Sequence, residues 1–234
     1  MPLEIEARIK EIIQRNYNVK SFRLDIGDIL DFKAGQFLSV SIGPDPRLKR
    51  YLSISSSPTE TCYLEFTKKL SESDFSKALN NLKAKDKLTI QYPFGKFVLD
   101  ESSPKIAFLS GGIGITPIRS ICKYVVDKGL GTDVVLIYSN RSIRDIVFKD
   151  DFDAMQKNYS LLRVAHVLCE AEPGFKCRVG LIDKGIVKNE IPDYQERKFY
   201  LCGPPQMVEA MHKILAEELG LGEERIAREN FQGY

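Results

Sequence analysis

The stretch SGGIGITP, residues 110–117, decides the fold of the second half of the chain. It lies between an apolar run at 106–110, which predicts a buried strand, and a helical pattern at 116–129. Glycines permit a tight turn, Thr116 can cap the helix, and Pro117 suits its first position. A strand, a turn and a helix in this order predict one unit of a parallel α/β sheet.

The free N–H groups of such a turn, together with the dipole of the helix that follows, favour phosphate groups. Gly112, Gly114, Thr116 and Pro117 are therefore candidate contacts to a dinucleotide. A plain strand-to-helix turn is the alternative for this motif taken alone.

The alternation of strands and helices continues along the chain and predicts an α/β parallel-sheet nucleotide-binding domain over residues 104–234. Cys202, Gly203 and Pro204 end one predicted strand, at the edge where ligands bind in open α/β sheets. A buried Cys202 that only packs is the alternative. The strands are predicted at 134–139, 161–168, 198–202 and 225–229, and the helices at 148–158 and 204–219.

Asn140 and Arg141 follow the second of these strands and are candidate nucleotide contacts. An arginine at this position suits a 2′-phosphate through charge-assisted, bidentate hydrogen bonds, so Arg141 favours NADPH over NADH. The alternative is that Arg141 and Arg144 are solvated side chains on a loop.

Residues 1–101 show short strands separated by turns, which predicts an antiparallel β-barrel domain with one helical stretch at 73–82. The segment Arg50-Tyr51-Leu52-Ser53 combines a cation with a strand and leads into a row of hydroxyls. It suits a phosphate-bearing aromatic cofactor, and a polar edge strand is the alternative. The strands are predicted at 3–13, 19–26, 36–42, 50–55, 62–70 and 87–94.

The composition is that of an ordinary globular protein. With 34 Lys and Arg against 32 Asp and Glu, the net charge of +2 gives no reason to expect a nucleic-acid partner. No stretch reaches 18 uninterrupted apolar residues, so we expect no membrane span and a cytoplasmic location. The five cysteines are spread singly, which predicts neither a disulfide framework nor a metal or iron–sulfur site.

Six motifs occur in one order: AGQF (34–37), RYLS (50–53), YPFGKF (92–97), GGIGITP (111–117), CGPPQM (202–207) and ENFQGY (229–234). In this order the chain resembles the ferredoxin-NADP reductase superfamily over essentially its whole length. Members have a flavin-binding antiparallel barrel followed by a pyridine-nucleotide domain, with the flavin at the domain interface.

The resemblance implies that Arg50 pairs with the cofactor pyrophosphate and that the Ser53 hydroxyl lies near flavin N5. The family motif is R-x-Y-S, and Leu52 replaces the tyrosine that stacks on the flavin. Tyr51 faces the opposite side of a strand, toward the adenine or the barrel surface. The resemblance also implies that Phe75 and Ser76 open a short helix whose N–H groups contact the same pyrophosphate, and that Lys68 and Lys69 line that site. Thr67 is a further candidate contact to the cofactor.

At the C-terminus, the resemblance matches Glu229 to an acidic residue and Phe231 to an aromatic one beside the flavin. Plant-type members instead end on a stacking tyrosine, which favours Tyr234, and a disordered tail is the alternative. Ser53, Cys202 and Glu229 are the candidate catalytic residues.

The implied activity is hydride transfer from NAD(P)H, with NADPH favoured, to bound FAD rather than FMN. The electrons then pass to a separate acceptor such as a ferredoxin, a flavodoxin or an oxygenase component. Three alternatives stay open: a non-catalytic flavin- or nucleotide-binding sensor, an electron-transfer subunit of a larger complex of the dihydroorotate dehydrogenase type, and a free flavin reductase or diaphorase. The residues predict no oligomeric state.

Overall fold

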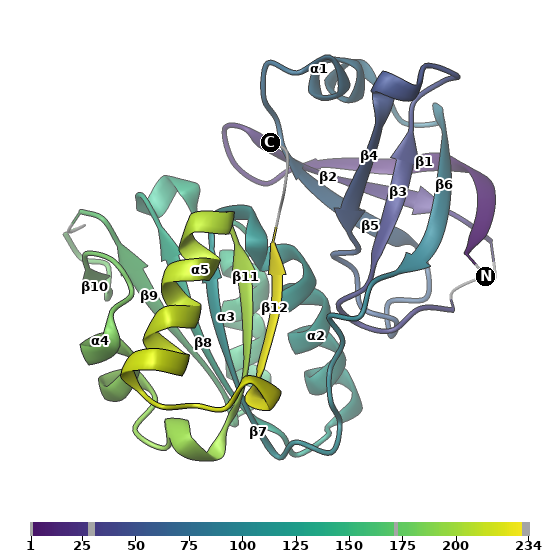
Figure 1. Ribbon diagram of the computed structural model, residues 1–234. Coiled ribbons are helices and arrows are strands. Elements are labelled where there is room, and N and C mark those ends of the chain that lie inside the picture. Colours follow the sequence, from purple (N-terminus) through teal and green to yellow (C-terminus); the bar gives the residue numbers. More distant parts are fainter. Residues whose placement is uncertain (1, 28–30, 171–172, 231–234) are drawn as a thin grey trace. The chain divides into compact units, whose positions relative to one another are not determined.

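In the computed structural model, which describes residues 2–27, 31–170 and 173–230, the chain forms two compact units (Figure 1). Met1–Leu99 and Thr116–Tyr124 make up the barrel unit, and Asp100–Ile115 and Val125–Gly233 make up the α/β unit. The predicted fold class, an antiparallel barrel followed by a parallel-sheet α/β domain, is confirmed.

The barrel unit is an antiparallel sheet in the order β4-β3-β6-β1-β2-β5. A bridge between Ile54 and Phe66 joins the two ends of this order and nearly closes the barrel. Its strands are β1 (Leu3–Gln14), β2 (Val19–Asp25), β3 (Phe37–Ser41), β4 (Lys49–Ser53), β5 (Leu64–Lys69) and β6 (Lys87–Phe94), and helix α1 (Asp74–Asn81) joins β5 to β6.

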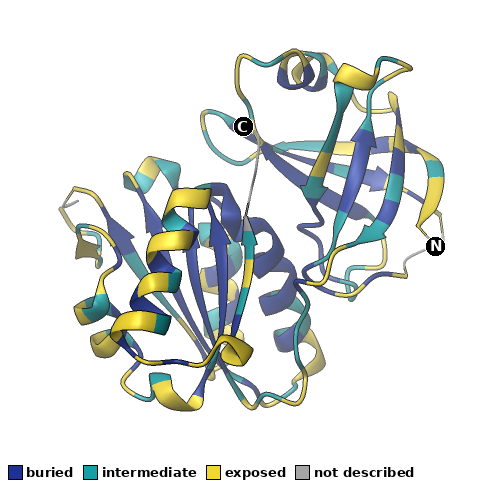
Figure 2. Ribbon diagram, in the orientation of Figure 1, coloured by how far each residue is buried: buried dark blue, intermediate teal, exposed yellow. Residues whose placement is uncertain are grey.

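Alternating side chains of these strands fill the barrel interior (Figure 2). Phe22 on β2 and Phe66 on β5 are fully buried and stack with their ring centroids 5.2 Å apart. Leu79 of α1 and Ile90 of β6 are fully buried in the same core. Burial of a side chain of this kind contributes about 1.5–3 kcal/mol, so the core rather than local propensity holds the barrel together.

The glycine of the AGQF motif shows how the first half of α2 (Ile115–Lys128) joins the barrel unit. Gly35 has a φ of +97°, and a Cβ added there would lie 2.1 Å from the Phe97 carbonyl oxygen and 3.0 Å from the Ile121 side chain. Only glycine fits between that backbone and that helix.

The α/β unit is a parallel sheet in the order β10-β9-β8-β7-β11-β12, with β7 near the middle (Figure 1). The strands are β7 (Lys105–Gly111), β8 (Asp133–Asn140), β9 (Leu162–Leu168), β10 (Arg178–Val179), β11 (Lys198–Gly203) and β12 (Ile226–Asn230). The helices beside α2 are α3 (Lys149–Asn158), α4 (Lys184–Glu190) and α5 (Pro205–Lys213).

Helices α4 and α5 cover one face of this sheet. Val187 of α4 and Val208 and Met211 of α5 pack on Val135 and Leu201 of the strands. The strands are dark blue in Figure 2 while the outer sides of these helices are yellow, as expected of helices with one apolar face. A π-helical segment, Ile214–Glu218, continues α5.

A buried arginine links the amino ends of the sheet strands. The Arg197 guanidinium is 5% exposed and donates to both carboxylate oxygens of Asp193, at 2.7 and 3.0 Å. It also donates to the Ile106 carbonyl and to the Asp133 carboxylate, at 3.1 and 2.8 Å. This network lies at the edge opposite to the glycine turn.

The start of α2 differs from the sequence-based prediction. Gly112–Gly114 forms a 3-10 turn that runs directly into the helix, so Gly114 and not Thr116 takes the N-cap position. Thr116 and Pro117 lie within the first turn. The prediction was wrong on the cap because the glycine turn already has helical backbone angles. Strand β10 and helix α4 were not predicted.

Candidate functional site

Ser53 ends β4 and carries a buried hydroxyl. The residue is 4% exposed, and among the described residues its buried Oγ has no hydrogen-bond partner. A buried polar atom left without a partner costs about 1–3 kcal/mol. Such an atom in a native fold indicates a place where a bound molecule completes the hydrogen bonding.

Two cations lie close together near the other end of β4. The Arg50 guanidinium donates to the carbonyl oxygens of Arg47 and Lys49, at 3.0 and 2.7 Å. Lys68 on β5 is 6% exposed, and burial lowers its pKa, as do the nearby charges of Arg50 and Lys69. A negatively charged group bound here would relieve the repulsion between these cations.

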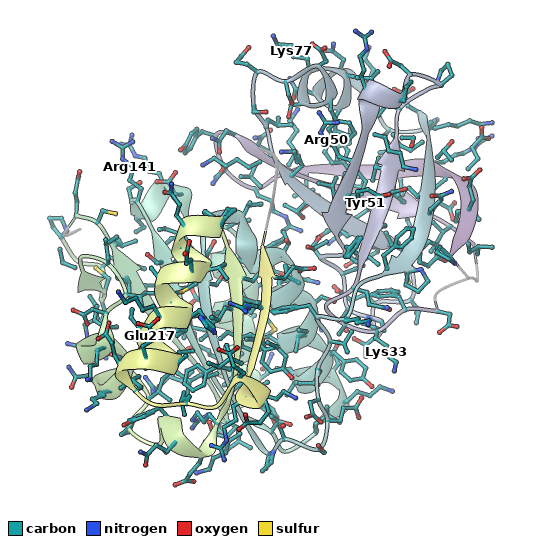
Figure 3. The ribbon with its side chains drawn as sticks, viewed as in Figure 1. Lys33, Arg50, Tyr51, Lys77, Arg141 and Glu217 are labelled. Carbon is teal, nitrogen blue, oxygen red and sulfur yellow. The ribbon has the colours of Figure 1, made fainter. Side chains whose placement is uncertain are left out.

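The N-terminus of α1 lies near these two cations and adds a helix dipole and serine hydroxyls to the candidate phosphate site. Arg50 lies beside this helix in Figure 3, with its guanidinium carbon 5.5 Å from the centre of the Phe75 ring. Ser73 caps the helix by accepting the Ser76 N–H at 3.3 Å, and the Ser71 hydroxyl lies 3.1 Å from both serine hydroxyls. This combination of cations, hydroxyls and a helix N-terminus fits a pyrophosphate.

The barrel unit therefore offers donors at both ends of β4 for a dinucleotide flavin. Arg50, Lys68 and the start of α1 fit the pyrophosphate of FAD, and the unpartnered Ser53 hydroxyl fits a polar atom of the flavin ring. FMN carries a single phosphate, so the two cations and the helix N-terminus together match FAD better.

Thr67 is buried with its hydroxyl already bonded within the barrel. Its Oγ1 lies 2.7 Å from Ser21 Oγ and 2.9 Å from Ser55 Oγ. Ser55 in turn donates to the Glu65 carboxylate at 2.9 Å. The side chain of Thr67 thus connects the segment after Ser53 to the barrel interior.

Leu52 and Tyr51 point to different surroundings. Leu52 is partly buried and packs against the barrel core. Tyr51 is 62% exposed on the barrel surface (Figure 3) and packs edge-on against Phe37 and Phe94, with ring centroids 5.8 Å apart in both pairs. Tyr51 therefore lies on the surface of the barrel unit, and its side chain is open to solvent.

In the α/β unit, the glycine turn is shaped by close backbone contacts. A Cβ on Gly114 would lie 2.4 Å from the Cys202 carbonyl oxygen, so the turn packs directly on the end of β11. Gly112 has a φ of +53° and would meet nothing within 4 Å. Of the glycines in this turn, Gly112 alone has a left-handed backbone and open space beside it, which leaves its backbone accessible to a phosphate group.

Three side chains form a row across the carboxyl ends of β7, β11 and β12. Cys202 pairs in register with Ser110 on one side and with Glu229 on the other. Among the described residues, Ser110 Oγ and Glu229 Oε2 are buried without a hydrogen-bond partner. Gly203 and Pro204 follow Cys202 and lead into α5. The row offers a thiol, a hydroxyl and a carboxyl to a ligand at this edge.

Burial determines the protonation of this row. It raises the pKa of Glu229 to about 7, and burial together with the Glu229 charge raises the pKa of the Cys202 thiol. Near neutral pH, Glu229 therefore exchanges a proton readily while Cys202 stays a neutral thiol.

Asn140 and Arg141 end β8 at the same carboxyl edge. Asn140 is 5% exposed. Arg141 is exposed and extends away from the ribbon in Figure 3. The Ser142 N–H and hydroxyl donate to the Asp145 carboxylate at 3.1 and 2.8 Å, which turns the chain after Arg141. Arg141 therefore follows β8 directly before a turn that two hydrogen bonds hold.

Two predicted site residues cannot be placed here, and two contacts at the site were not predicted. Phe231 and Tyr234 lie outside the described residues. Ser110 was part of the quoted glycine motif but was not selected, although its register opposite Cys202 follows from the parallel strands. Met207 closes the CGPPQM motif but was not selected, and its Sδ would lie 2.0 Å from a Cβ on Gly111.

Within the described part of the chain, no group of three or more His, Cys, Asp or Glu side chains could hold a metal ion. A search of the same residues for a helix both long and apolar enough to cross a bilayer found none.

Both units of the chain match known protein families. Residues 4–99 match the family described as "Oxidoreductase FAD-binding domain", and residues 108–213 match "Oxidoreductase NAD-binding domain". The chain is 30% identical over 222 residues to the glycine betaine monooxygenase reductase subunit of Chromohalobacter salexigens, covering 89% of this chain and 59% of that protein. It is 30% identical over 227 residues to NADH-cytochrome b5 reductase 1 of Aspergillus terreus, covering 91% of this chain and 76% of that protein.

The fold is also that of solved reductases. The ferredoxin NADP+ reductase of Neisseria gonorrhoeae with bound FAD and NADP aligns with a TM-score of 0.85 at 20% identity, over 97% of this chain and 98% of that one. With these matches over both units, the chain belongs to the ferredoxin-NADP reductase superfamily of FAD- and NAD(P)-binding oxidoreductases.

Proposed function

We propose that this chain takes a hydride from NAD(P)H onto bound FAD and passes the electrons to a separate redox protein. The observation that carries the proposal is the buried Ser53 hydroxyl, which has no hydrogen-bond partner in the described part of the chain. It lies on the same strand as Arg50, which is close to Lys68. Bound FAD would supply the chemistry, because a flavin accepts a hydride and releases electrons one at a time.

The residues of the chain bind and orient the flavin and the nucleotide, and one of them can exchange a proton. Arg50, Lys68 and the N-terminus of α1 hold the pyrophosphate, and Ser53 donates to the flavin ring. Gly112 brings its backbone to the nucleotide phosphates. Glu229 holds or releases a proton at Oε2 near neutral pH, because burial raises its pKa to about 7.

The names of the relatives support the acceptor class that we propose. The chain spans 59% of the length of the glycine betaine monooxygenase reductase subunit that it matches, and that name places the relative in an oxygenase system. Other relatives are named for cytochrome b5. We propose an acceptor of the same kind: a ferredoxin, a flavodoxin or an oxygenase component.

The visible spectrum of the purified protein tests the function. We expect flavin absorption from released FAD, bleaching within seconds of anaerobic NADPH addition, and return of colour when an oxidised ferredoxin is added. Flavin that stays oxidised with both NADPH and NADH would contradict the reductase activity and support a non-catalytic binding module. Bleaching without reoxidation by any tested protein acceptor would contradict the acceptor class.

Arg141 is proposed to select NADPH by binding the 2′-phosphate. Replacing Arg141 by alanine removes charge-assisted bonds worth about 1.5–3 kcal/mol and should raise KM for NADPH about tenfold or more, with KM for NADH unchanged. Steady-state kinetics with both nucleotides measures this, with Arg144→Ala as the control on the same turn. Equal effects on both nucleotides would show that Arg141 does not read the 2′-phosphate. Both nucleotides are compared because one relative is named for NADH.

A further inference from the structure

Arg119 is a buried cation on the second turn of α2. Its side chain is 3% exposed, and it pairs with both carboxylate oxygens of Glu60, at 3.0 Å for Nη2 to Oε1. Nη1 also donates to the Ser55 carbonyl oxygen at 3.1 Å. The next residue, Ser120, donates its hydroxyl to the Ser56 carbonyl oxygen at 2.6 Å.

Glu60 extends this network to the next residue of the same segment. It accepts the Ser57 N–H at 2.7 Å and the Tyr63 hydroxyl at 2.7 Å. Burial acts to raise the pKa of Glu60, but the adjacent Arg119 overcomes this effect and holds the pKa below its usual value. Three consecutive residues, 55–57, are thus bonded to α2 or to the carboxylate that pairs with it.

Both partners of this network lie near candidate cofactor-binding residues in the sequence. Residues 55–57 follow Ser53 after a single residue, and α2 begins directly after the turn Gly112–Gly114. Ser53 is therefore two residues from the first bonded residue, Ser55, and Arg119 is five residues from the end of the glycine turn.

Stability alone does not account for a buried ion pair. Removing two charges from water costs about as much as their attraction returns, so apolar side chains of similar size would serve a purely structural role equally well. Such a pair can fix the orientation of the segment it bonds, because a guanidinium donates at defined angles to a carboxylate and to a carbonyl.

Resting on the proposed function, we propose that Arg119 and Glu60 are positioning residues for flavin reduction. They hold segment 55–57 and, through it, the orientation of the Ser53 hydroxyl toward the flavin. They do not touch the reacting atoms, so their loss changes the rate of reduction rather than the affinity for the nucleotide.

Anaerobic stopped-flow reduction of the FAD-saturated protein by NADPH tests this in Arg119→Lys and Glu60→Gln. Misplacing a reacting group by about 1 Å costs up to about 100-fold in rate, so the limiting rate should fall about 10- to 100-fold. The apparent dissociation constant for NADPH should change by less than about twofold. The double variant should be no slower than the slower single variant, because both remove one linkage.

Arg197→Lys is the matched control, since Arg197 is equally buried and also joins a carboxylate to a backbone carbonyl at the far edge of the sheet. It should lower the melting temperature without lowering the limiting rate. If Arg119→Lys does the same, the role is structural and the proposal is wrong.

Ser120→Ala covers the case in which Arg119→Lys fails to fold. It deletes one bond to Ser56 and should slow reduction severalfold with a near-normal melting temperature; an unchanged rate would overturn the proposal. A wild-type protein that NADPH does not reduce would instead contradict the proposed function, so the two failures are distinguishable.

Discussion

Replacing Arg50 by methionine is expected to weaken FAD binding by about 10- to 100-fold. A hydrogen bond to a charged group contributes about 1.5–3 kcal/mol, and each 1.4 kcal/mol changes an equilibrium constant tenfold. Fluorescence titration of the apoprotein with FAD measures the dissociation constant. Arg47→Met is the control, because Arg47 is exposed and paired with Asp45 at 2.8 Å. An equal loss in both variants would contradict a specific role for Arg50.

Lys68→Met distinguishes the effect of this residue on FAD affinity from its effect on the stability of the folded protein. Burial and the nearby charge of Arg50 lower the pKa of Lys68, so the folded apoprotein is strained by this buried cation. The substitution should keep or raise the melting temperature of the apoprotein while FAD affinity falls. A variant that is less stable and binds FAD normally would show that Lys68 only packs.

The second large effect is expected at Glu229, as a change in how stability depends on pH. The folded pKa of about 7 lies above the ordinary value of 4.5, so the folded protein keeps a proton that the unfolded chain loses between these values. Stability of the wild type therefore falls as pH rises from about 4.5 to about 7. Glutamine carries no charge and avoids this loss.

Glu229→Gln should therefore raise the free energy of unfolding by up to about 3 kcal/mol at pH 8 and change it little at pH 4. This is an upper value, because Glu229 is only partly buried and solvent screens its charge. Urea unfolding at both pH values measures it, with exposed Glu209→Gln as the control. A pH-independent difference would contradict the raised pKa.

The same carboxyl should appear in the kinetics. The rate of flavin reduction by NADPH is expected to change with an inflection near pH 7 in the wild type and to lose that inflection in Glu229→Gln. A persistent inflection in the variant would assign the titration to another group.

Sequence reasoning worked where the pattern is local. The barrel, the α/β unit and the glycine turn follow from motifs of four to eight neighbouring residues, whose turn and strand preferences act over the same short distances. It failed at the start of α2, where Thr116 was predicted to cap the helix. The 3-10 turn at Gly112–Gly114 already continues into the helix and leaves the cap to Gly114.

The candidate site was predicted in part for the same reason. Cys202 was selected from the end of a predicted strand, and Arg50, Ser53 and Glu229 were given their roles by the family resemblance. Ser110 was missed, because its importance comes from the register of β7 against β11.

By itself, then, the sequence determined the two fold types, their order and the motifs that mark a flavin and a nucleotide. Only the tertiary structure brought Arg119 to Glu60, which are 59 residues apart, and left the Ser53 hydroxyl buried without a partner in the described chain. Only burial raised the pKa of Glu229. Ion pairing, desolvation and unmet hydrogen bonds depend on which distant groups surround an atom, and no local pattern of residues encodes that.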